Sequence, residues 1–293
     1  MNMTNGKWNG IFRNMKRSTR SLAERVIIRP LAAALGISLL DCAHRQMGIG
    51  DCAPAAAGEQ YLISRVLPQL LNGTAPVIFD VGANIGDYSR MLLRQFVQAT
   101  IYAFEPVPGN FAVLAANISK SNVHRLPMGL GERQETLVIY DYAQGIGSQH
   151  ASLFRNVFSD FHKATAISEA PVPITTLDDF CTLKSIPRID FLKIDTEGNE
   201  LAVLRGGKRM IGAGNVPIIQ FEFNEMNVAS RCFLKDFYDL LSGYDFYRLA
   251  ESRLIRLKEY QPRYEIFQFQ NILALRNSDY PFARVRDFVY RVR

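Results

Sequence analysis

Acidic residues and glycines gather where a short apolar run ends. The stretch "VIFDVGANIG" places Asp80 at the end of such a run and then Gly82, Asn84 and Gly86. Glycines let the backbone approach a ligand, and the N–H groups of the following helix start point toward it. The middle glycine of the dinucleotide fingerprint is replaced by Asn84, and the last glycine comes early. The turn therefore favours a nucleoside-like ligand without phosphates, such as S-adenosyl-L-methionine, with a purely structural turn as the alternative.

A second apolar run, "TIYAF", is followed by Glu105 and Pro106. An acidic residue at the end of the second strand of such a unit can accept both ribose hydroxyls of a nucleoside. The third run ends in "PMGLG", where Met128 and Gly129 are expected to lie against an adenine ring. Plain core packing is the alternative reading for these two residues.

Two later runs end in polar side chains that suit catalysis. In "LKIDTEGNE", Asp195 is predicted to act as a catalytic group, Glu197 to orient the substrate and Thr196 to cap the next helix. In "FEFNE", Glu222 and Asn224 alternate with phenylalanines, so both face one side of a strand and are expected to orient an acceptor. For Glu222 and Asn224 the alternative is structural hydrogen bonding, and for the first group it is that Glu197 and Glu200 simply favour the positive end of the helix.

His150 lies in the polar, glycine-flanked stretch "GIGSQHASLF". Histidine titrates near physiological pH, so His150 is the second candidate, beside Asp195, for a general base. The four cysteines are scattered and form no C-x-x-C pair, and we expect neither a metal site nor disulfides.

The elements that position these residues alternate between strand and helix from about residue 59 onward. Short β-rich runs such as "PVIFDVG" are apolar on both faces, as buried parallel strands are. The sequence predicts an α/β fold with a mostly parallel sheet, helices on both faces and a final antiparallel pair at one edge. A long polar insertion without periodicity is expected to run up to Pro173. In such sheets ligands bind beyond the carboxyl ends of the strands, where all the candidate residues fall.

The chain has 293 residues, is 48% hydrophobic and carries a net charge of +6, which is globular composition. The basic excess lies at the two ends, away from the glycine turn, which argues against a nucleic-acid enzyme. We predict a basic, partly helical extension over 1–55, a catalytic domain over 56–277 and a basic tail over 278–293. The apolar run at 30–40 is too short to span a membrane, a signal peptide is not favoured, and peripheral membrane contact through the basic termini is a hypothesis. Scattered cysteines favour a cytoplasmic location.

Five blocks together resemble the FkbM-type methyltransferases: "FDVGANIGDYS", "FEPVPGNFAVLAAN", "TTLDDF", "IDFLKIDTEGNELAVLRGG" and "IIQFEFNE". The resemblance covers roughly residues 59–276. It implies a class I, Rossmann-like fold, S-adenosyl-L-methionine as cofactor and a hydroxyl acceptor on a sugar, glycan or other small metabolite. Two alternatives remain at this point: a nicotinamide-dependent oxidoreductase, and a non-catalytic cofactor-binding or scaffold protein.

Overall fold

The computed structural model describes residues 22, 24–71, 75–142, 153 and 167–289. Contacts divide the chain into two compact units, Met1–Gln46 and Met47–Arg293. The second unit begins upstream of the predicted start at residue 56, and it includes Ile49, which is buried. The described elements of the first unit are η1 (Glu24–Ile28), α2 (Arg29–Ala34) and α3 (Leu39–Gln46).

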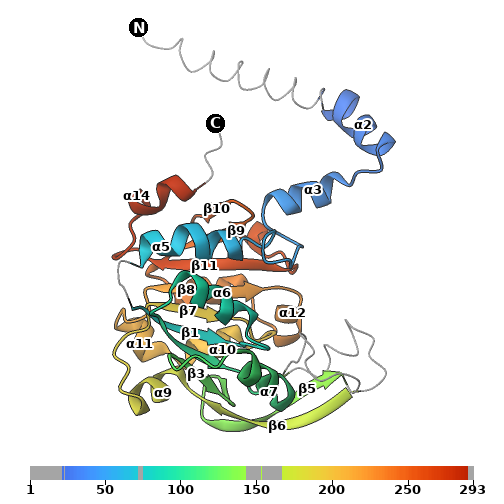
Figure 1. Cartoon of the computed structure of the whole chain (residues 1–293). Coiled ribbons are helices and arrows are strands. Elements are labelled where there is room, and N and C mark those ends of the chain that lie inside the picture. Colours follow the sequence, from blue (N-terminus) through green and yellow to red (C-terminus); the bar gives the residue numbers. More distant parts are fainter. Residues whose placement is uncertain (1–21, 23, 72–74, 143–152, 154–166, 290–293) are drawn as a thin grey trace. The chain divides into compact units, whose positions relative to one another are not determined.

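The second unit is built on an eight-stranded sheet (Figure 1). Its strands, in spatial order, are β10 (Arg253–Leu257), β9 (Tyr244–Ala250), β11 (Gln270–Arg276), β8 (Ile218–Phe223), β7 (Phe191–Ile194), β1 (Val77–Val81), β2 (Thr100–Phe104) and β3 (Val123–Leu126). The five strands from β8 to β3 are parallel, whereas β11, β9 and β10 pair antiparallel. This arrangement confirms the predicted Rossmann-like sheet with antiparallel strands at one edge.

The antiparallel edge has three strands where the sequence predicted two. β10, with the sequence RLIRL, was missed, because it follows β9 after a turn of only two residues and reads as its continuation. β11 lies inside the sheet, between β8 and β9, and is buried along most of its length. The segment predicted as a tail includes α14 (Phe282–Val285) and η4 (Arg286–Phe288), and Tyr280 and Val285 are buried in the core.

A second, three-stranded sheet has the order β4 (Gly129–Leu130), β6 (Ile167–Thr175) and β5 (Glu135–Tyr142). β5 and β6 form a long antiparallel pair in register from Glu135 opposite Ile174 to Tyr142 opposite Ile167. The expectation of an irregular insertion up to Pro173 is therefore wrong from Ile167 onward. The sequence predicts a strand only from Val172, because proline is depleted in strands and β6 contains Pro171 and Pro173. β6 tolerates them although it lies between β4 and β5, since β4 pairs only with Ile174 and Thr175.

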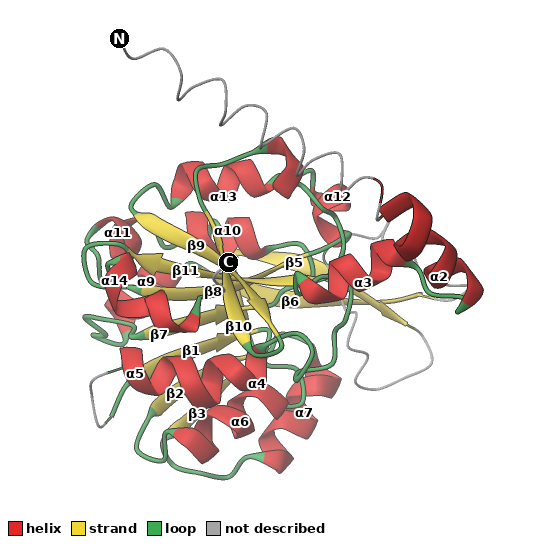
Figure 2. Ribbon diagram, turned by 90° about the horizontal axis from the view of Figure 1, so that it is seen from above, coloured by secondary structure: helices red, strands yellow, loops and turns green. Residues whose placement is uncertain are grey.

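Helices cover both faces of the large sheet (Figure 2). One face packs α9 (Leu177–Leu183), α10 (Glu200–Arg205), α11 (Lys208–Gly212) and α13 (Leu234–Leu240). The other face packs α4 (Glu59–Tyr61), η2 (Leu62–Val66), α5 (Leu67–Leu70), α6 (Asp87–Gln95), α7 (Pro108–Asn117) and α14. The remaining described elements are α12 (Met226–Ser230) and η3 (Pro262–Tyr264). Each face has its own hydrophobic cluster, which is why the central strands are apolar on both sides.

Strand register places three polar side chains in a row on the face beneath α4 and α6. Asp80 on β1 pairs with Lys193 on β7, and Lys193 pairs with Gln220 on β8. Their neighbours Ile78, Phe191 and Ile218 belong to the cluster of that same face, as the alternation of side chains along a strand requires. These three buried polar side chains lie beneath the candidate site.

Candidate functional site

A cavity of about 530 Å³ opens beyond the carboxyl ends of the parallel strands. The first residue after each of four strands lines it: Gly82 after β1, Glu105 after β2, Asp195 after β7 and Asn224 after β8. Its volume lies in the range of small-molecule and cofactor sites. The cavity thus brings together residues that are distant in sequence, at the position that open α/β sheets use for ligands.

The glycine turn forms one wall of the cavity. Gly82 has φ +81°, and a Cβ there would lie 1.7 Å from the backbone oxygen of Asp195, so the first glycine lets the β1 and β7 loops touch. Asn84 also has positive φ and lines the cavity. Gly86 is not among the lining residues, and a Cβ there would collide with side chains of α7 and the loop after it. Gly86 therefore has a packing role in this structure, and it does not line the cavity as the predicted cofactor contact requires.

Glu105 is buried and holds two loops together. Its Oε2 accepts a hydrogen bond from the N–H of Asn84, and its Oε1 accepts one from the N–H of Val107, each at 2.8 Å. Burial, only partly opposed by these two bonds, raises the pKa of the Glu105 carboxyl to about 7. A carboxylate oxygen has capacity for more than one donor, so these contacts leave room for ribose hydroxyls.

Of the two residues predicted to border an adenine ring, the structure places Gly129 in the cavity lining and Met128 outside it. Gly129 and Leu130, the two residues of β4, line the cavity. Met128, just before β4, packs against the hydrophobic cluster that also contains Leu130, and it is absent from the lining.

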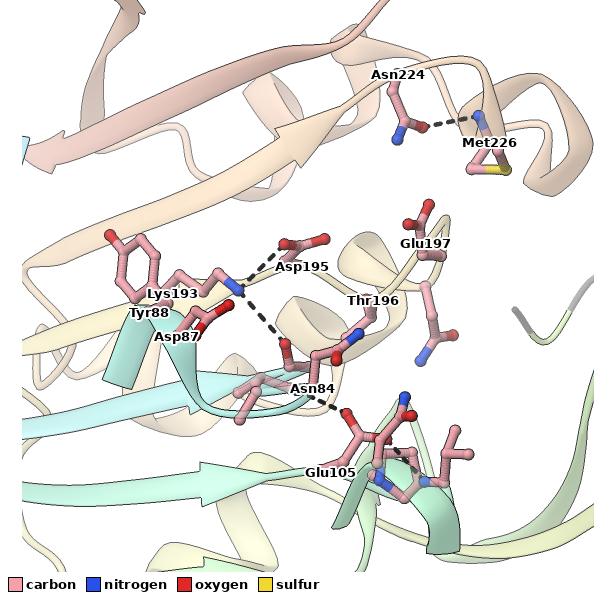
Figure 3. A pocket seen from close by; sticks show the side chains of 18 of the residues that line it. Asn84, Asp87, Tyr88, Glu105, Lys193, Asp195, Thr196, Glu197, Asn224 and Met226 are labelled. Carbon is pink, nitrogen blue, oxygen red and sulfur yellow. Dashed lines mark hydrogen bonds and ion pairs between the residues drawn. The ribbon is translucent and has the colours of Figure 1, made fainter. Parts of the chain in front are cut away.

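Lys193 lies at the floor of the cavity among carboxylates (Figure 3). Its Nζ is 3.1 Å from Asp195 Oδ2 and 3.4 Å from Asp80 Oδ1, and it lies 5.0 Å from the centre of the Tyr88 ring. Burial alone would lower the pKa of Lys193, but the charges of Asp195, Asp80 and Glu59 outweigh burial and raise it. Lys193 therefore stays charged and fixes the Asp195 carboxylate.

Asp80 lies below the cavity and does not line it. Its side chain is fully buried, and its Oδ2 accepts a hydrogen bond from Ser89 Oγ at 2.7 Å. Asp80 therefore balances the charge of Lys193 and anchors the first turn of α6. The sequence predicts a contact between Asp80 and the cofactor, but in this structure Asp80 reaches the cavity only through Lys193.

Glu59, at the start of α4, completes the floor. Its Oε1 accepts hydrogen bonds from Gln220 Nε2 at 3.1 Å and from Asn271 Nδ2 at 3.5 Å. Gln220 also accepts a hydrogen bond from the Tyr88 hydroxyl. Burial raises the pKa of the Glu59 carboxyl to about 7, against the opposing charge of Lys193. A carboxyl with such a pKa changes its charge within the physiological range.

The turn after β7 is shaped by a buried carboxylate. Glu200 Oε1 accepts hydrogen bonds from the N–H of Thr196 (2.8 Å), from the Thr196 hydroxyl (3.0 Å) and from the N–H of Gly198 (3.1 Å). Glu197, between them, has φ +52° and lines the cavity. The predicted cap at Thr196 is wrong, because α10 begins only at Glu200, after Asn199. Left-handed backbone at a residue other than glycine is concentrated in such functional turns.

Glu222 and Asn224 contact each other, since Asn224 Nδ2 donates to Glu222 Oε1. Asn224 Oδ1 accepts from the N–H of Met226 at 2.8 Å, and Asn224 lines the cavity (Figure 3). Glu222 is buried and does not line it. Burial, and then the negative charges of Asp195 and Glu197, raise the pKa of Glu222 well above its ordinary value. Glu222 thus supports Asn224 from behind and does not contact a ligand directly.

The charged residues that line the cavity are mostly acidic. Six carboxyls belong to the lining, Glu59, Asp87, Glu105, Asp195, Glu197 and Glu225, against one cation among the described residues, Lys193. His150, the other predicted base, lies outside the residues that the structure describes.

Sequence reasoning placed Lys193 in the polar group around Asp195 without a role of its own, and it missed the rest of the cavity floor. Lys193, Gln220 and Asn271 are polar residues of buried strands, a position that signals a partner. Glu59 and Tyr88 lie on helices whose pattern is ordinary, and only packing brings them to Gln220. Polar residues at strand interiors are therefore the signal by which part of this group can be recognised.

Comparison with known proteins gives consistent matches. The family model described as the methyltransferase FkbM domain matches residues 80–254, more than half of the chain. "Methyltransferase 1" of Beauveria bassiana is 30% identical over 142 residues, which cover 44% of this chain and 57% of the relative. The 2-O-methyltransferase NoeI of Sinorhizobium fredii is 26% identical over 51% of this chain and 64% of the relative. The hexuronic acid methyltransferase AglP of Haloferax volcanii is 24% identical over 56% of this chain and 62% of the relative. The matched part thus spans less than two thirds of each relative's length.

Proposed function

The chain belongs to the FkbM methyltransferase family, and from that premise we propose that it transfers a methyl group from S-adenosyl-L-methionine to a hydroxyl oxygen of a small acceptor. One observation carries the proposal. Glu105 lies in the cavity at the end of β2 and is bonded to the glycine turn through Asn84. An acidic residue in this position hydrogen-bonds the ribose in dinucleotide-binding α/β folds, which supports a nucleoside-containing cofactor here.

The residues present fit that cofactor. Glu105 would accept the ribose hydroxyls, the backbone of Gly82 and Asn84 would border the amino-acid part, and Gly129 with Leu130 would border the adenine. Substitution of Gly82 by any residue with a Cβ would collide with the neighbouring loop, which indicates a closely approached backbone. When bound, S-adenosyl-L-methionine supplies a methyl group already activated by its sulfonium.

The protein must then position an acceptor and receive its proton. A hydroxyl becomes a good nucleophile as its proton leaves, and a positioned base contributes about 10²–10⁴-fold. Asp195 lines the cavity and is held by Lys193 at 3.1 Å, so its carboxylate is the base that we assign among the described residues. Asn224, fixed by Glu222 and by the N–H of Met226, would orient the acceptor oxygen.

The acidic lining bears on the class of acceptor. Burial leaves the Glu59 and Glu105 carboxyls partly protonated near pH 7, but the other four carboxyls of the lining still outnumber Lys193, so the lining attracts cations and repels carboxylates, sulfates and phosphates. A neutral hydroxyl compound such as a neutral sugar therefore fits better than a uronic acid. The hexuronic acid named for the Haloferax relative is anionic, so acceptor charge is a point on which the two proteins are expected to differ.

The first test is calorimetric titration with S-adenosylhomocysteine and, separately, with NAD⁺. We expect micromolar affinity for the first and none for the second; preference for NAD⁺ would return the site to the oxidoreductase alternative. Transfer of labelled methyl to neutral and anionic sugars follows. Asp195→Asn and His150→Gln variants then test the base: near-normal turnover of both would remove the assignment.

A further inference from the structure

The first unit carries a concentration of exposed apolar side chains. Between residues 22 and 40 nine large apolar side chains are 40–63% exposed: Leu22, Val26, Ile27, Ile28, Leu31, Leu35, Ile37, Leu39 and Leu40. Among the described residues of this unit only Ala32 is buried, so this described part has no core of its own. In the described part of the second unit, exposed large apolar residues are fewer and scattered along the sequence. Apolar clusters of this kind mark interaction surfaces.

Basic residues accompany the apolar cluster. Residues 1–46 contain eight lysines and arginines and two acidic residues, and 8 − 2 = +6 equals the net charge of the whole chain. Residues 47–293 therefore sum to zero. Within the described helices the charged residues are Arg25, Arg29 and Arg45 against Glu24 and Asp41, 3 − 2 = +1, and Arg29 contacts Glu24 at 2.9 Å; the other five basic residues precede these helices in the sequence. Apolar and cationic side chains on the same short helices are the composition of segments that bind anionic membrane surfaces.

The helices are too short to cross a bilayer one at a time. Among the described residues no single helix is long and apolar enough to span a membrane, although Glu24–Ala34 and Leu39–Gln46 pass that test together, with a bend of 97°. At about 1.5 Å per residue, the first of them is about 16 Å long, half of a hydrocarbon core. Gly36, with φ +64°, lies at the bend, and a Cβ added there would meet nothing within 4 Å. Bent short helices of this kind suit the interface plane.

We infer that the helices of residues 24–46 bind the surface of an anionic lipid bilayer, inserting their leucine, isoleucine and valine side chains while the arginines contact lipid headgroups. A protein partner or a second copy of the chain would satisfy the apolar side chains. Neither accounts for the net charge of +6 in residues 1–46; in residues 47–293 the basic residues near the C-terminal end are balanced by acidic residues elsewhere in that stretch, and the sum is zero. This inference is independent of the methyl-transfer proposal.

The test is co-sedimentation of the full chain with vesicles of phosphatidylcholine alone and of phosphatidylcholine with about 30% phosphatidylglycerol, a content that gives a strongly anionic surface. We expect binding to the anionic vesicles that weakens with added salt. The variant Val26→Ser/Ile27→Ser/Leu31→Ser should lower the partition constant at least tenfold. The control is Val97→Ser/Leu183→Ser, which removes two apolar side chains of the second unit that are more exposed, at 74% and 78%, than the three test residues, and it should bind like the wild type.

A charge variant separates the two contributions. Arg25→Gln/Arg45→Gln should lower binding to anionic vesicles about fivefold or more per charge, and leave the weak binding to neutral vesicles unchanged. Circular dichroism and thermal unfolding should match the wild type for every variant, since the substituted residues lie outside the core. Equal sedimentation of the triple-serine variant and the wild type overturns the inference. So does a vesicle-independent dimer, seen by light scattering, that the triple-serine variant loses.

Discussion

Replacing Glu105 by alanine should weaken cofactor binding about 10²-fold in the protein that remains folded. The carboxylate is expected to accept two ribose hydroxyls, and hydrogen bonds to a charged group contribute about 1.5–3 kcal/mol each. The low end of this energy range applies. Burial raises the pKa of Glu105 to about 7, so about half of the ligand-free protein has a protonated, uncharged Glu105 at pH 7. The sum is about 3 kcal/mol, which is about a 10²-fold loss of affinity for S-adenosylhomocysteine in calorimetry.

A matched variant distinguishes binding from folding. Glu105 accepts the N–H groups of Asn84 and Val107, so alanine also leaves two backbone donors without this acceptor. Asp178 has the same arrangement away from the cavity, where its two oxygens accept the N–H groups of Arg209 (2.8 Å) and Met210 (2.9 Å). Asp178→Ala should lower the free energy of unfolding and keep affinity within about twofold.

The pH dependence gives a second readout of the same group. The carboxylate fraction rises from about 0.1 at pH 6 to about 0.9 at pH 8 for a pKa near 7, so affinity should rise about tenfold over that interval. Glu105→Ala should flatten this slope. The reasoning is refuted if folded Glu105→Ala binds S-adenosylhomocysteine within threefold of the wild type, or if affinity falls with rising pH.

Three further results are expected. Gly82→Ala should cost about 3 kcal/mol or more in urea denaturation, because its Cβ meets a backbone oxygen at 1.7 Å and φ is +81°, whereas Gly212→Ala, with nothing within 4 Å, should be neutral or stabilising. Lys193→Met should cost about 3–5 kcal/mol by leaving buried carboxylates without their cation, whereas exposed Lys208→Met should change stability by less than about 0.5 kcal/mol. Burial raises the pKa of Glu59 from 4.5 to about 7, so the contribution of this carboxyl to stability is present below pH 4.5 and is lost as pH rises through 7. The free energy of unfolding of Glu59→Gln should therefore rise by about 2 kcal/mol relative to that of the wild type between pH 5 and pH 8.5. A difference that does not change with pH would contradict the assigned burial.

The sequence by itself determined the order of elements and the edge of the sheet at which the site lies. Apolar runs that end in Gly82, Glu105, Asp195 and Asn224 identify strands that are buried on both faces, and parallel strands must present their carboxyl ends together. Four separate stretches of sequence therefore pointed to one cavity, and the folded chain brings them together there.

Only the tertiary structure decided which side chains face the ligand space and which support it from behind. Met128 packs against the core whereas the next residue, Gly129, lines the cavity, and of the buried pair Glu222 and Asn224 only Asn224 lines it. The hydrogen bond between Glu59 and Gln220 connects a helix to a strand that comes much later in the sequence. Such contacts depend on register and on packing between elements, which local periodicity does not encode.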